Sequence, residues 1–288
     1  MKVGGAIALC SLALFAQDFS EITFDTLAKG MGHTEGPAWS RDGYLIFSDT
    51  AGDKLWKWSP GVPVAVFREN ANGPSGNAFD ADGRLYTCET RTRRLTRTDK
   101  KGAIEVIADK WEGKRLNAPN DVVVSRATGH IYFTDPAFGD QEDHRELDFY
   151  GVYNLAPKGG AMKLVAKPKG RPNGVALSPN GRILYVVNSD ERNVRAYDLD
   201  RNGDASNERV VVAKIPGVPG GIRTDEKGNP YVAGRSIFVY SPEGKPVHTI
   251  ELHNAAANCG FGEVDGRTLF IAEAGDLNRA RLPLKGAY

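Results

Sequence analysis

The chain contains 288 residues, with 37 Lys and Arg against 36 Asp and Glu, which gives a formal net charge of +1. Because charges of both signs are interspersed, the sequence has no basic patch for a nucleic acid, and we expect no nucleic-acid partner. The length suffices for one large all-β domain and does not require a second domain.

The N-terminal segment has the pattern of a secretory signal. Lys2 is followed by an apolar run from Gly4 to Ala16, which is shorter than the about twenty residues that a membrane-spanning helix needs. We predict a signal peptide over residues 1–17 and a mature protein that is periplasmic or secreted, with no membrane association after cleavage. A buried N-terminal strand or helix is the alternative.

One hairpin pattern recurs along the rest of the chain. Each copy has a polar residue, a short apolar run, a turn with glycine and a second apolar run, which predicts two antiparallel strands. The copies cover residues 35–49, 75–89, 120–135, 173–188, 220–234 and 258–273, with turn glycines at Gly43, Gly83, Gly129, Gly181, Gly228 and Gly266.

Further strand candidates follow each hairpin. A third comes after every copy, as at residues 54–60, and several copies have a fourth, as at residues 63–69. Four strands in each repeat of roughly 40–50 residues are typical of a propeller blade. The sequence therefore predicts an all-β, six-bladed β-propeller with four-stranded antiparallel blades, forming a single domain over residues 18–288. The strand at residues 21–30 is expected to complete the last blade and close the ring.

The first strand of each predicted blade begins at a position that is polar in most copies. Counting back from the turn glycines gives Glu35, Ser75, Asn173, Gly220 and Asn258, and in the third copy, whose turn is one residue longer, Asn120 rather than Asp121. Innermost strands surround the channel of a propeller, so these side chains should converge. Converging oxygens suit a hard cation such as calcium, which takes about six to eight oxygen ligands. Gly220 has no side chain to contribute.

A second polar series ends the returning strands of the hairpins. It consists of Asp49, Glu89, Asp135, Asn188, Gly234 and Glu273. Acidic side chains at strand ends often accept hydrogen bonds from loop amides, and we favour that structural role over a second ring of ligands.

Three other features have a structural and a functional interpretation. His144 lies in a long segment, residues 136–151, that should form a loop over the channel mouth, where a solvated histidine is expected rather than a catalytic one. Arg93, in the run TRTRRLTR, is a candidate for holding a polyol or carboxylate, although exposed strand arginines are the simpler interpretation. Cys88 and Cys259 fit no metal motif, and we expect buried free thiols.

These stretches resemble the regucalcin, gluconolactonase and luciferin-regenerating-enzyme family, and its bacterial gluconolactonase-like branch in particular. The resemblance is carried by HTEGPAWSRDGYLIFSD, TRTRRLTR, KRLNAPNDVVV, IYFTDPAFG, RPNGVALSPNGRILYV and NCGFGEVDGRTLFIAEA, which span about residues 33–275. It implies a six-bladed propeller that holds one divalent cation in its channel and hydrolyses sugar lactones. Calcium is the expected ion, with zinc or manganese as alternatives.

The resemblance also implies roles for individual residues. By position, Glu35, Asn120 and Asn173 match metal ligands, and Asn120 also matches a substrate contact. The family has an aspartate in a PDG motif that is a further ligand and a proposed general base. Here the motif reads PGG, so that aspartate is replaced by Gly220.

The general base is therefore unassigned from the sequence. Asp121 and Glu35 are candidate substitutes, and Asn120, Arg93 and Asn258 are candidate substrate-binding residues. We expect an exported, divalent-metal-dependent lactonase, monomeric or weakly oligomeric, that acts on a sugar lactone. The alternatives are a degenerate propeller that binds a sugar-like ligand or a metal without turnover, and a scaffold that binds another protein.

Overall fold

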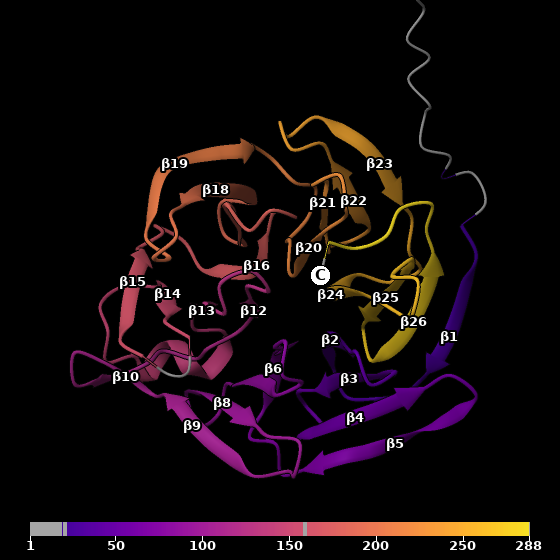
Figure 1. The fold of residues 1–288 in the computed structure, drawn as a ribbon, viewed down its shortest axis with the longest axis horizontal. Helices are drawn as coiled ribbons and strands as arrows, with labels where there is room; N and C mark the ends of the chain where they lie inside the picture. The colour runs from indigo at the N-terminus through magenta and orange to yellow at the C-terminus, as the bar shows by residue number, and fades with distance from the viewer. Residues whose placement is uncertain (1–18, 20–21, 158–159, 288) are drawn as a thin grey trace, which may run out of the picture.

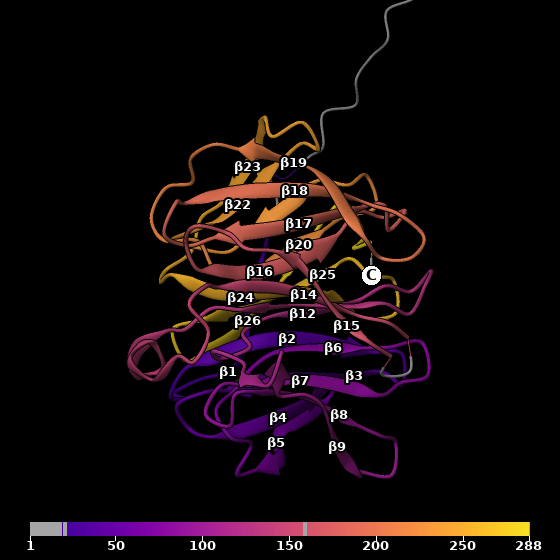
Figure 2. The same ribbon diagram turned by 90° about the vertical axis from the view of Figure 1, so that its left-hand side faces the viewer.

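Six four-stranded antiparallel sheets stand around a central axis as the blades of a propeller (Figure 1), which confirms the predicted fold. This computed structural model describes residues 19, 22–157 and 160–287. The predicted signal peptide, residues 1–17, lies outside the described residues. Seen from the side, the stacked strands of neighbouring blades run across the disc (Figure 2).

In each blade the strands follow one another from the channel outward. The first blade contains β2 (Thr34–Ser40), β3 (Tyr44–Asp49), β4 (Lys54–Ser59) and β5 (Val62–Glu69). The second contains β6 (Pro74–Phe79), β7 (Leu85–Glu89), β8 (Arg94–Thr98) and β9 (Ile104–Ala108). The third contains β12 (Val122–Val124), β13 (Ile131–Asp135), β14 (Gly151–Leu155) and β15 (Met162–Ala166).

The same order holds in the second half of the chain. The fourth blade contains β16 (Pro172–Leu177), β17 (Ile183–Asn188), β18 (Asn193–Leu199) and β19 (Ala205–Val212). The fifth contains β20 (Ile222–Thr224), β21 (Pro230–Val232), β22 (Ile237–Tyr240) and β23 (Pro246–Ile250). The sixth contains β24 (Ala256–Gly262), β25 (Thr268–Glu273) and β26 (Asp276–Arg281), and its outer strand is β1 (Phe24–Ala28).

The ring is closed by pairing the two ends of the chain. β1 runs antiparallel to β26, with Phe24 opposite Ala280 and Asp25 opposite Arg279. The sequence predicted this closure from the strand at residues 21–30. A strand from the N-terminus thus completes the blade built by the C-terminus, so the first and last blades are tied through backbone hydrogen bonds.

The glycine turns form as the repeat pattern predicts. In the first blade Gly43 has φ +85, a left-handed conformation that favours glycine, and its amide donates to the carbonyl oxygen of Ser40 at 3.0 Å. This turn joins β2 to β3 and sets the register in which Ser40 faces Tyr44.

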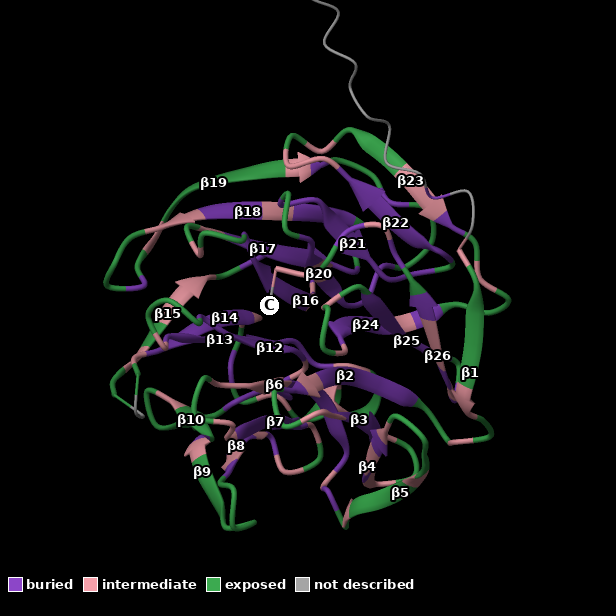
Figure 3. Ribbon diagram, turned by 45° about the vertical axis from the view of Figure 1, so that its right-hand side comes forward, coloured by how far each residue is buried: buried purple, intermediate pink, exposed green. Residues whose placement is uncertain are grey.

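The hydrophobic core is divided among the blades. Apolar side chains of the described residues cluster between neighbouring sheets, one cluster at each junction around the ring. The strands near the channel are buried, whereas β5, β9 and β19 at the rim are largely exposed (Figure 3). Cys88 and Cys259 are fully buried within two of these clusters as free thiols, as expected.

Two short insertions interrupt the blade pattern. A small hairpin of β10 (Lys110–Trp111) and β11 (Lys114–Arg115) precedes the third blade, and a 3-10 helix, η1 (Gly139–His144), follows β13. In Figure 2 the coiled ribbon of η1 projects from one face of the disc. No helix within the described part of the chain is long and apolar enough to cross a membrane.

Candidate active site

One end of the central channel opens into a cavity of about 660 Å³. Its wall is built where the first strand of each blade begins, and η1 contributes Gly139, Asp140 and Gln141. A volume of this size lies within the roughly 300–1,000 Å³ of small-molecule sites. The cavity is therefore large enough for a small cyclic ester with several hydroxyl groups.

The structure brings five of the positions counted from the sequence to this cavity. They are Glu35, Ser75, Asn120, Asn173 and Gly220. Equivalent backbone hydrogen bonds fix two of these places, because Gly76 donates to the carbonyl oxygen of Asn120 and Gly174 to that of Gly220. The repeat therefore builds a ring of side chains at one depth.

The sixth position is Ala257, not Asn258, which corrects the register predicted for the last blade. Gly221 donates to the carbonyl oxygen of Ala257 at 2.8 Å, the same contact that the other blades make at their ring position. The loop between Gly262 and Thr268 is longer than that of the first blade, so counting back eight residues from Gly266 stops one residue short of the ring position. Ala257 lines the cavity and Asn258 lies one residue deeper.

Asn258 instead donates a hydrogen bond to the Glu35 carboxylate. Its Nδ2 donates to Glu35 Oε2 at 2.9 Å, and the amide of Gly36 donates to the same oxygen at 2.9 Å. Burial raises the pKa of Glu35 to about 7, and nearby Asp121 acts in the same direction, whereas the two hydrogen bonds lower the pKa. Glu35 is thus a fixed, buried carboxylate whose charge is costly without a cation beside it.

The amide oxygens of the ring are suited to complete a cation site. Asn173 Nδ2 donates to Ser189 Oγ at 3.1 Å, while its Oδ1 is buried and has no hydrogen-bond partner among the described residues. Asn120 Nδ2 donates to Ser75 Oγ at 3.3 Å, which leaves its Oδ1 for another contact. An orphaned amide oxygen beside a buried carboxylate fits a hard cation held by oxygen ligands.

Glu35, Asn120 and Asn173 together offer a cation only one negatively charged side chain. The described residues contain no cluster of three or more His, Cys, Asp or Glu side chains that could hold a metal ion. The ring supplies one carboxylate and two amide oxygens, which suits calcium or manganese better than zinc, because zinc sites usually contain nitrogen or sulfur ligands. A cation bound here would keep water or substrate oxygens in the rest of its shell.

The backbone at Gly220 excludes a side chain. A Cβ at Gly220 would overlap the carbonyl oxygen of Ala257 in the next blade. The Gly220 amide and carbonyl are both used, donating to Ala233 at 2.9 Å and accepting from Gly174 at 3.1 Å. The ring position without a side chain is therefore one where the backbone of the next blade packs closely.

Asp121 does not line the cavity and is already paired. Its Oδ2 accepts from Arg223 Nη1 at 3.0 Å and from the amide of Val175 at 3.0 Å. The preceding residue, Asn120, lines the cavity, whereas Val122 and the partner Arg223 line a second, smaller space farther along the channel. The structure does not support Asp121 as a substitute base in the cavity.

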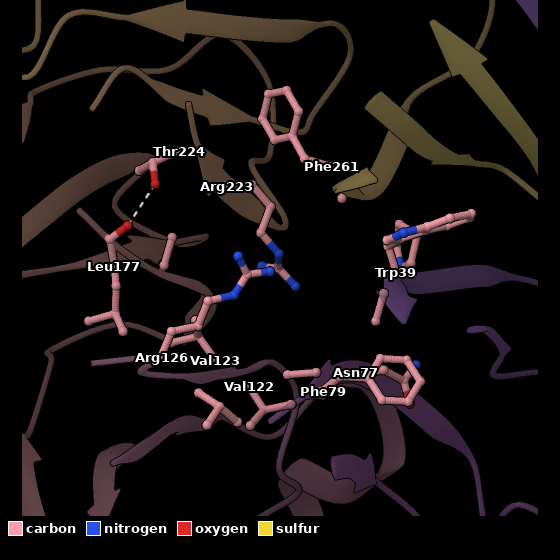
Figure 4. Close-up of a pocket in the computed structure, with 16 residues that line it drawn as sticks. Trp39, Asn77, Phe79, Val122, Val123, Arg126, Leu177, Arg223, Thr224 and Phe261 are labelled. Carbon is pink, nitrogen blue, oxygen red and sulfur yellow. Dashed lines mark hydrogen bonds between the residues drawn. The ribbon is translucent and has the colours of Figure 1, made fainter. Parts of the chain in front are cut away.

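The far end of the channel is narrower. It has a volume of about 80 Å³ and is walled by aromatic and apolar side chains, among them Trp39, Phe79 and Phe261. Figure 4 shows Arg223 pointing into this space beside Arg126. The larger cavity, with its polar ring, is the better candidate for catalysis.

Arg93 does not reach the cavity. It is buried, and its Nε donates to the carbonyl oxygen of Leu116 at 2.7 Å while its Nη1 donates to that of His144 at 2.9 Å. Arg91 lines the cavity instead, at its exposed edge, and pairs with Asp53 at 3.1 Å. Arg93 is thus a structural tie between two segments that border the site.

The second polar series ties loops, as favoured from the sequence. Asp135 accepts hydrogen bonds from the amides of Asn117 and Ala118 at 2.8 Å each, and burial raises its pKa to about 7. This contact fixes the segment that leads into Asn120. Loop amides donate likewise to Asp49, Asn188 and Glu273, whereas Glu89 accepts mainly from arginine and hydroxyl side chains.

Residues 136–151 contribute side chains to the cavity, but His144 is not among them. His144 is exposed and does not line the cavity, whereas Phe138, Asp140 and Gln141 do. His33, just before β2, also lines it. Nothing in the repeat pattern marks these residues, because η1 and the residues before β2 lie outside the repeated hairpin.

Known proteins share this sequence pattern and fold. The gluconolactonase of Zymomonas mobilis is 32% identical over an alignment that covers 89% of this chain and 80% of that protein. The solved structure of a gluconolactonase from Xanthomonas campestris is 32% identical, covers 94% of this chain and 93% of that one, and has a TM-score of 0.86. The structure of a calcium-binding protein, regucalcin, from Agrobacterium tumefaciens shares the fold, with a TM-score of 0.77 at 18% identity.

The similarity extends over most of the chain. A family model described as the SMP-30/Gluconolactonase/LRE-like region matches residues 33–275, which include all the ring positions of the cavity. The repeat, the ring and the match agree with one another. The chain therefore belongs to the SMP-30, gluconolactonase and LRE-like family.

Proposed function

We propose that this protein is a divalent-metal-dependent lactonase that hydrolyses a sugar lactone. The observation that carries the proposal is the polar ring of Glu35, Asn120 and Asn173 around a cavity of about 660 Å³. Similarity to two gluconolactonases, each at 32% identity over most of the chain, supports the reaction class.

Glu35, Asn173 and Asn120 would hold the cation. They offer a carboxylate and two amide oxygens, and calcium is the ion that this set favours, with manganese or zinc as alternatives. When bound, such an ion polarises the carbonyl group of an ester and stabilises negative charge on its oxygen. The buried Glu35 would be ionised by the ion, because a nearby positive charge lowers the pKa of a carboxylate.

The rest of the cavity would orient the substrate. Asn120 and Ser75 present polar groups to the hydroxyls of a sugar ring, while Phe138 and Ala257 provide apolar surface. Asn258 acts indirectly, by fixing the Glu35 carboxylate at 2.9 Å. This mixture of polar and apolar groups is typical of small-molecule sites.

A second candidate function is binding of a sugar-like ligand or a metal without turnover. It is favoured by the two ring positions without a polar side chain, Gly220 and Ala257. A binder of this kind would show saturable heat on titration with an aldonolactone and no acid release.

Acid release in a pH-stat distinguishes these functions. The protein is stripped with a chelator, then given calcium, manganese or zinc, with gluconolactone and a panel of small lactones as substrates. We expect hydrolysis above the buffer rate with at least one ion and none after stripping. A protein that remains at the buffer rate with every ion and lactone, yet binds them, would be a binder instead.

We further propose that the protein is exported. The support is the charged start at Lys2 and the apolar run that follows it. Mass spectrometry of protein from the periplasm or the medium should find a chain that begins near residue 18. A full-length chain found only in the cytoplasm would contradict this.

A further inference from the structure

We propose that Asp140 is the general base of this site and supplies the carboxylate that Gly220 lacks. The inference rests on the proposed lactonase function and adds a catalytic residue to it. It assigns η1, outside the repeated hairpins, to the chemistry of the channel.

Asp140 lines the same cavity as Glu35. Among the described residues that line the cavity, the carboxylates belong to Glu35 and Asp140. The candidates nearby are otherwise occupied, because Asp121 pairs with Arg223 and Asp135 accepts two loop amides. Glu35 is held by two hydrogen bonds and is a proposed ligand of the cation, which makes it a poor base.

The Asp140 carboxylate is also unengaged. It is exposed, and no hydrogen bond or ion pair joins it to another described residue. The neighbouring acid in the same turn, Glu142, is by contrast bound to Tyr150 Oη at 2.9 Å and to Arg145 at 3.0 Å. A base must keep its carboxylate available for a proton from water, and Asp140 meets that condition.

The segment that carries Asp140 is anchored at both ends. On one side the Arg171 guanidinium lies 4.9 Å from the centre of the Phe138 ring and pairs with Asp190 at 2.6 Å. On the other side Arg93 donates to the carbonyl oxygen of His144 at 2.9 Å. These contacts hold η1 against the cavity, so the carboxylate is presented from a fixed turn.

A second negative charge favours Asp140 over His33, another side chain of the cavity wall that could take a proton. The ring alone provides one carboxylate for a divalent cation. Asp140 would place a second negative charge in the cavity without binding the ion, whereas a histidine supplies no negative charge. Attraction between unlike charges therefore favours the carboxylate as the group that works beside a cation.

In the proposed reaction, water opens the lactone ring with Asp140 as the proton carrier. The oxygen of a water molecule forms a bond to the lactone carbonyl carbon, while the Asp140 carboxylate takes one of the water protons. The bond between that carbon and the ring oxygen then breaks, and the proton passes from Asp140 to the ring oxygen, which leaves as a hydroxyl group. The product is the hydroxy acid, and the carboxylate is regenerated.

The test compares Asp140→Asn with Asp143→Asn, a matched change in the same turn at a residue that does not line the cavity. Loss of a general base should lower kcat by about 10²–10⁴-fold in Asp140→Asn. Asp143→Asn should match the wild type. Formate should restore part of the activity of Asp140→Ala, which a purely structural role would not allow, and calcium affinity measured by calorimetry should be unchanged.

Several outcomes would overturn the assignment. Asp140→Asn with wild-type kcat would exclude Asp140 as the base, and a large loss in His33→Gln alone would transfer the role to His33. A parallel loss of calcium affinity in Asp140→Asn would make Asp140 a ligand instead. If the wild type hydrolyses no lactone, the proposed function fails and this inference with it, whereas an active wild type with an active Asp140→Asn rejects the inference alone.

Discussion

Gly220 shows how a single residue changes both chemistry and packing. The ring position has no side chain, and the backbone there lies against the carbonyl oxygen of Ala257. Gly234 occupies the corresponding place in the second polar series of the same blade, but a Cβ there would lie 3.5 Å from its nearest neighbour, an ordinary contact. The two glycines therefore differ in what a side chain would cost.

We predict that Gly220→Ala destabilises the fold and Gly234→Ala does not. The added methyl group at Gly220 must displace backbone of the next blade, and overpacking of this kind costs about 1–3 kcal/mol. The free energy of unfolding in urea measures the difference between the two variants. Equal stabilities would show that the backbone at Gly220 relaxes readily, and Gly220→Asp could then add a carboxylate to the ring.

Glu35 should make stability depend on pH when no cation is present. Its pKa of about 7 in the folded protein lies above the ordinary value of 4.5, so the folded state binds the proton more tightly. The stabilisation from this proton is complete below pH 4.5 and is lost as the pH rises through about 7. Glu35→Gln removes the effect because an amide does not titrate in this range. Its oxygen can still accept the hydrogen bonds from Gly36 and Asn258.

We therefore predict that, in chelator, the wild type loses about 1–3 kcal/mol relative to Glu35→Gln between pH 4.5 and pH 8. Urea unfolding of both proteins across this range provides the measurement. Parallel pH profiles would mean that the buried carboxylate keeps an ordinary pKa. Added calcium should raise the stability of the wild type at pH 8 and leave Glu35→Gln unchanged.

At the scale of elements, Arg93 connects two segments that border the cavity. It joins the segment before Asn120, through Leu116, to the end of η1, through His144. Arg97, in the strand β8 that follows Arg93, pairs with Glu105 at 2.6 Å in the outer part of the blade. Substitution of Arg97 is therefore a control for substitution of Arg93, whose hydrogen bonds join the two segments.

We predict that Arg93→Met loosens η1 while Arg97→Met does not. Hydrogen bonds from a charged donor contribute about 1.5–3 kcal/mol each, so amide exchange in residues 139–146 should become faster by about tenfold or more. The kcat/KM for a lactone should fall in parallel. Unchanged exchange in Arg93→Met would show that the Phe138 end alone holds the turn.

The sequence predicted the elements of the ring better than their exact register. The six hairpins, their glycine turns and the closing strand all follow from the repeat, because apolar alternation and turn chemistry are local signals. Ala257 was missed because the longer loop before Thr268 shifts the count, although the third copy had shown the same effect. Asp140 and the role of Arg93 depend on how η1 docks, which no local pattern encodes.

At the scale of the whole molecule, the ring depends on pairing between its two ends. β1 contributes four residue pairs with β26, and Asp25 also pairs with Arg279 at 3.0 Å. The blades hold the ring positions at one depth only while the circle is closed. Closure is therefore expected to support both stability and the cavity.

We predict that removing residues 2–28 destabilises the protein, whereas removing residues 2–17 does not. Each lost backbone hydrogen bond contributes about 0.5–1.5 kcal/mol, so loss of β1 should cost about 2–5 kcal/mol. Thermal and urea unfolding of both shortened chains provide the measurement. Equal stability of the two would show that the sixth blade is complete with three strands.

The most direct test of the whole site is hydrolysis of gluconolactone by the metal-loaded wild type beside Glu35→Gln, followed as acid release above the buffer rate. Because Glu35 is the carboxylate of the ring and its replacement keeps both hydrogen bonds, the variant should remain folded. We predict clear acceleration by the wild type and a fall to the buffer rate in Glu35→Gln. Equal rates in the two proteins would contradict a lactonase site at this ring.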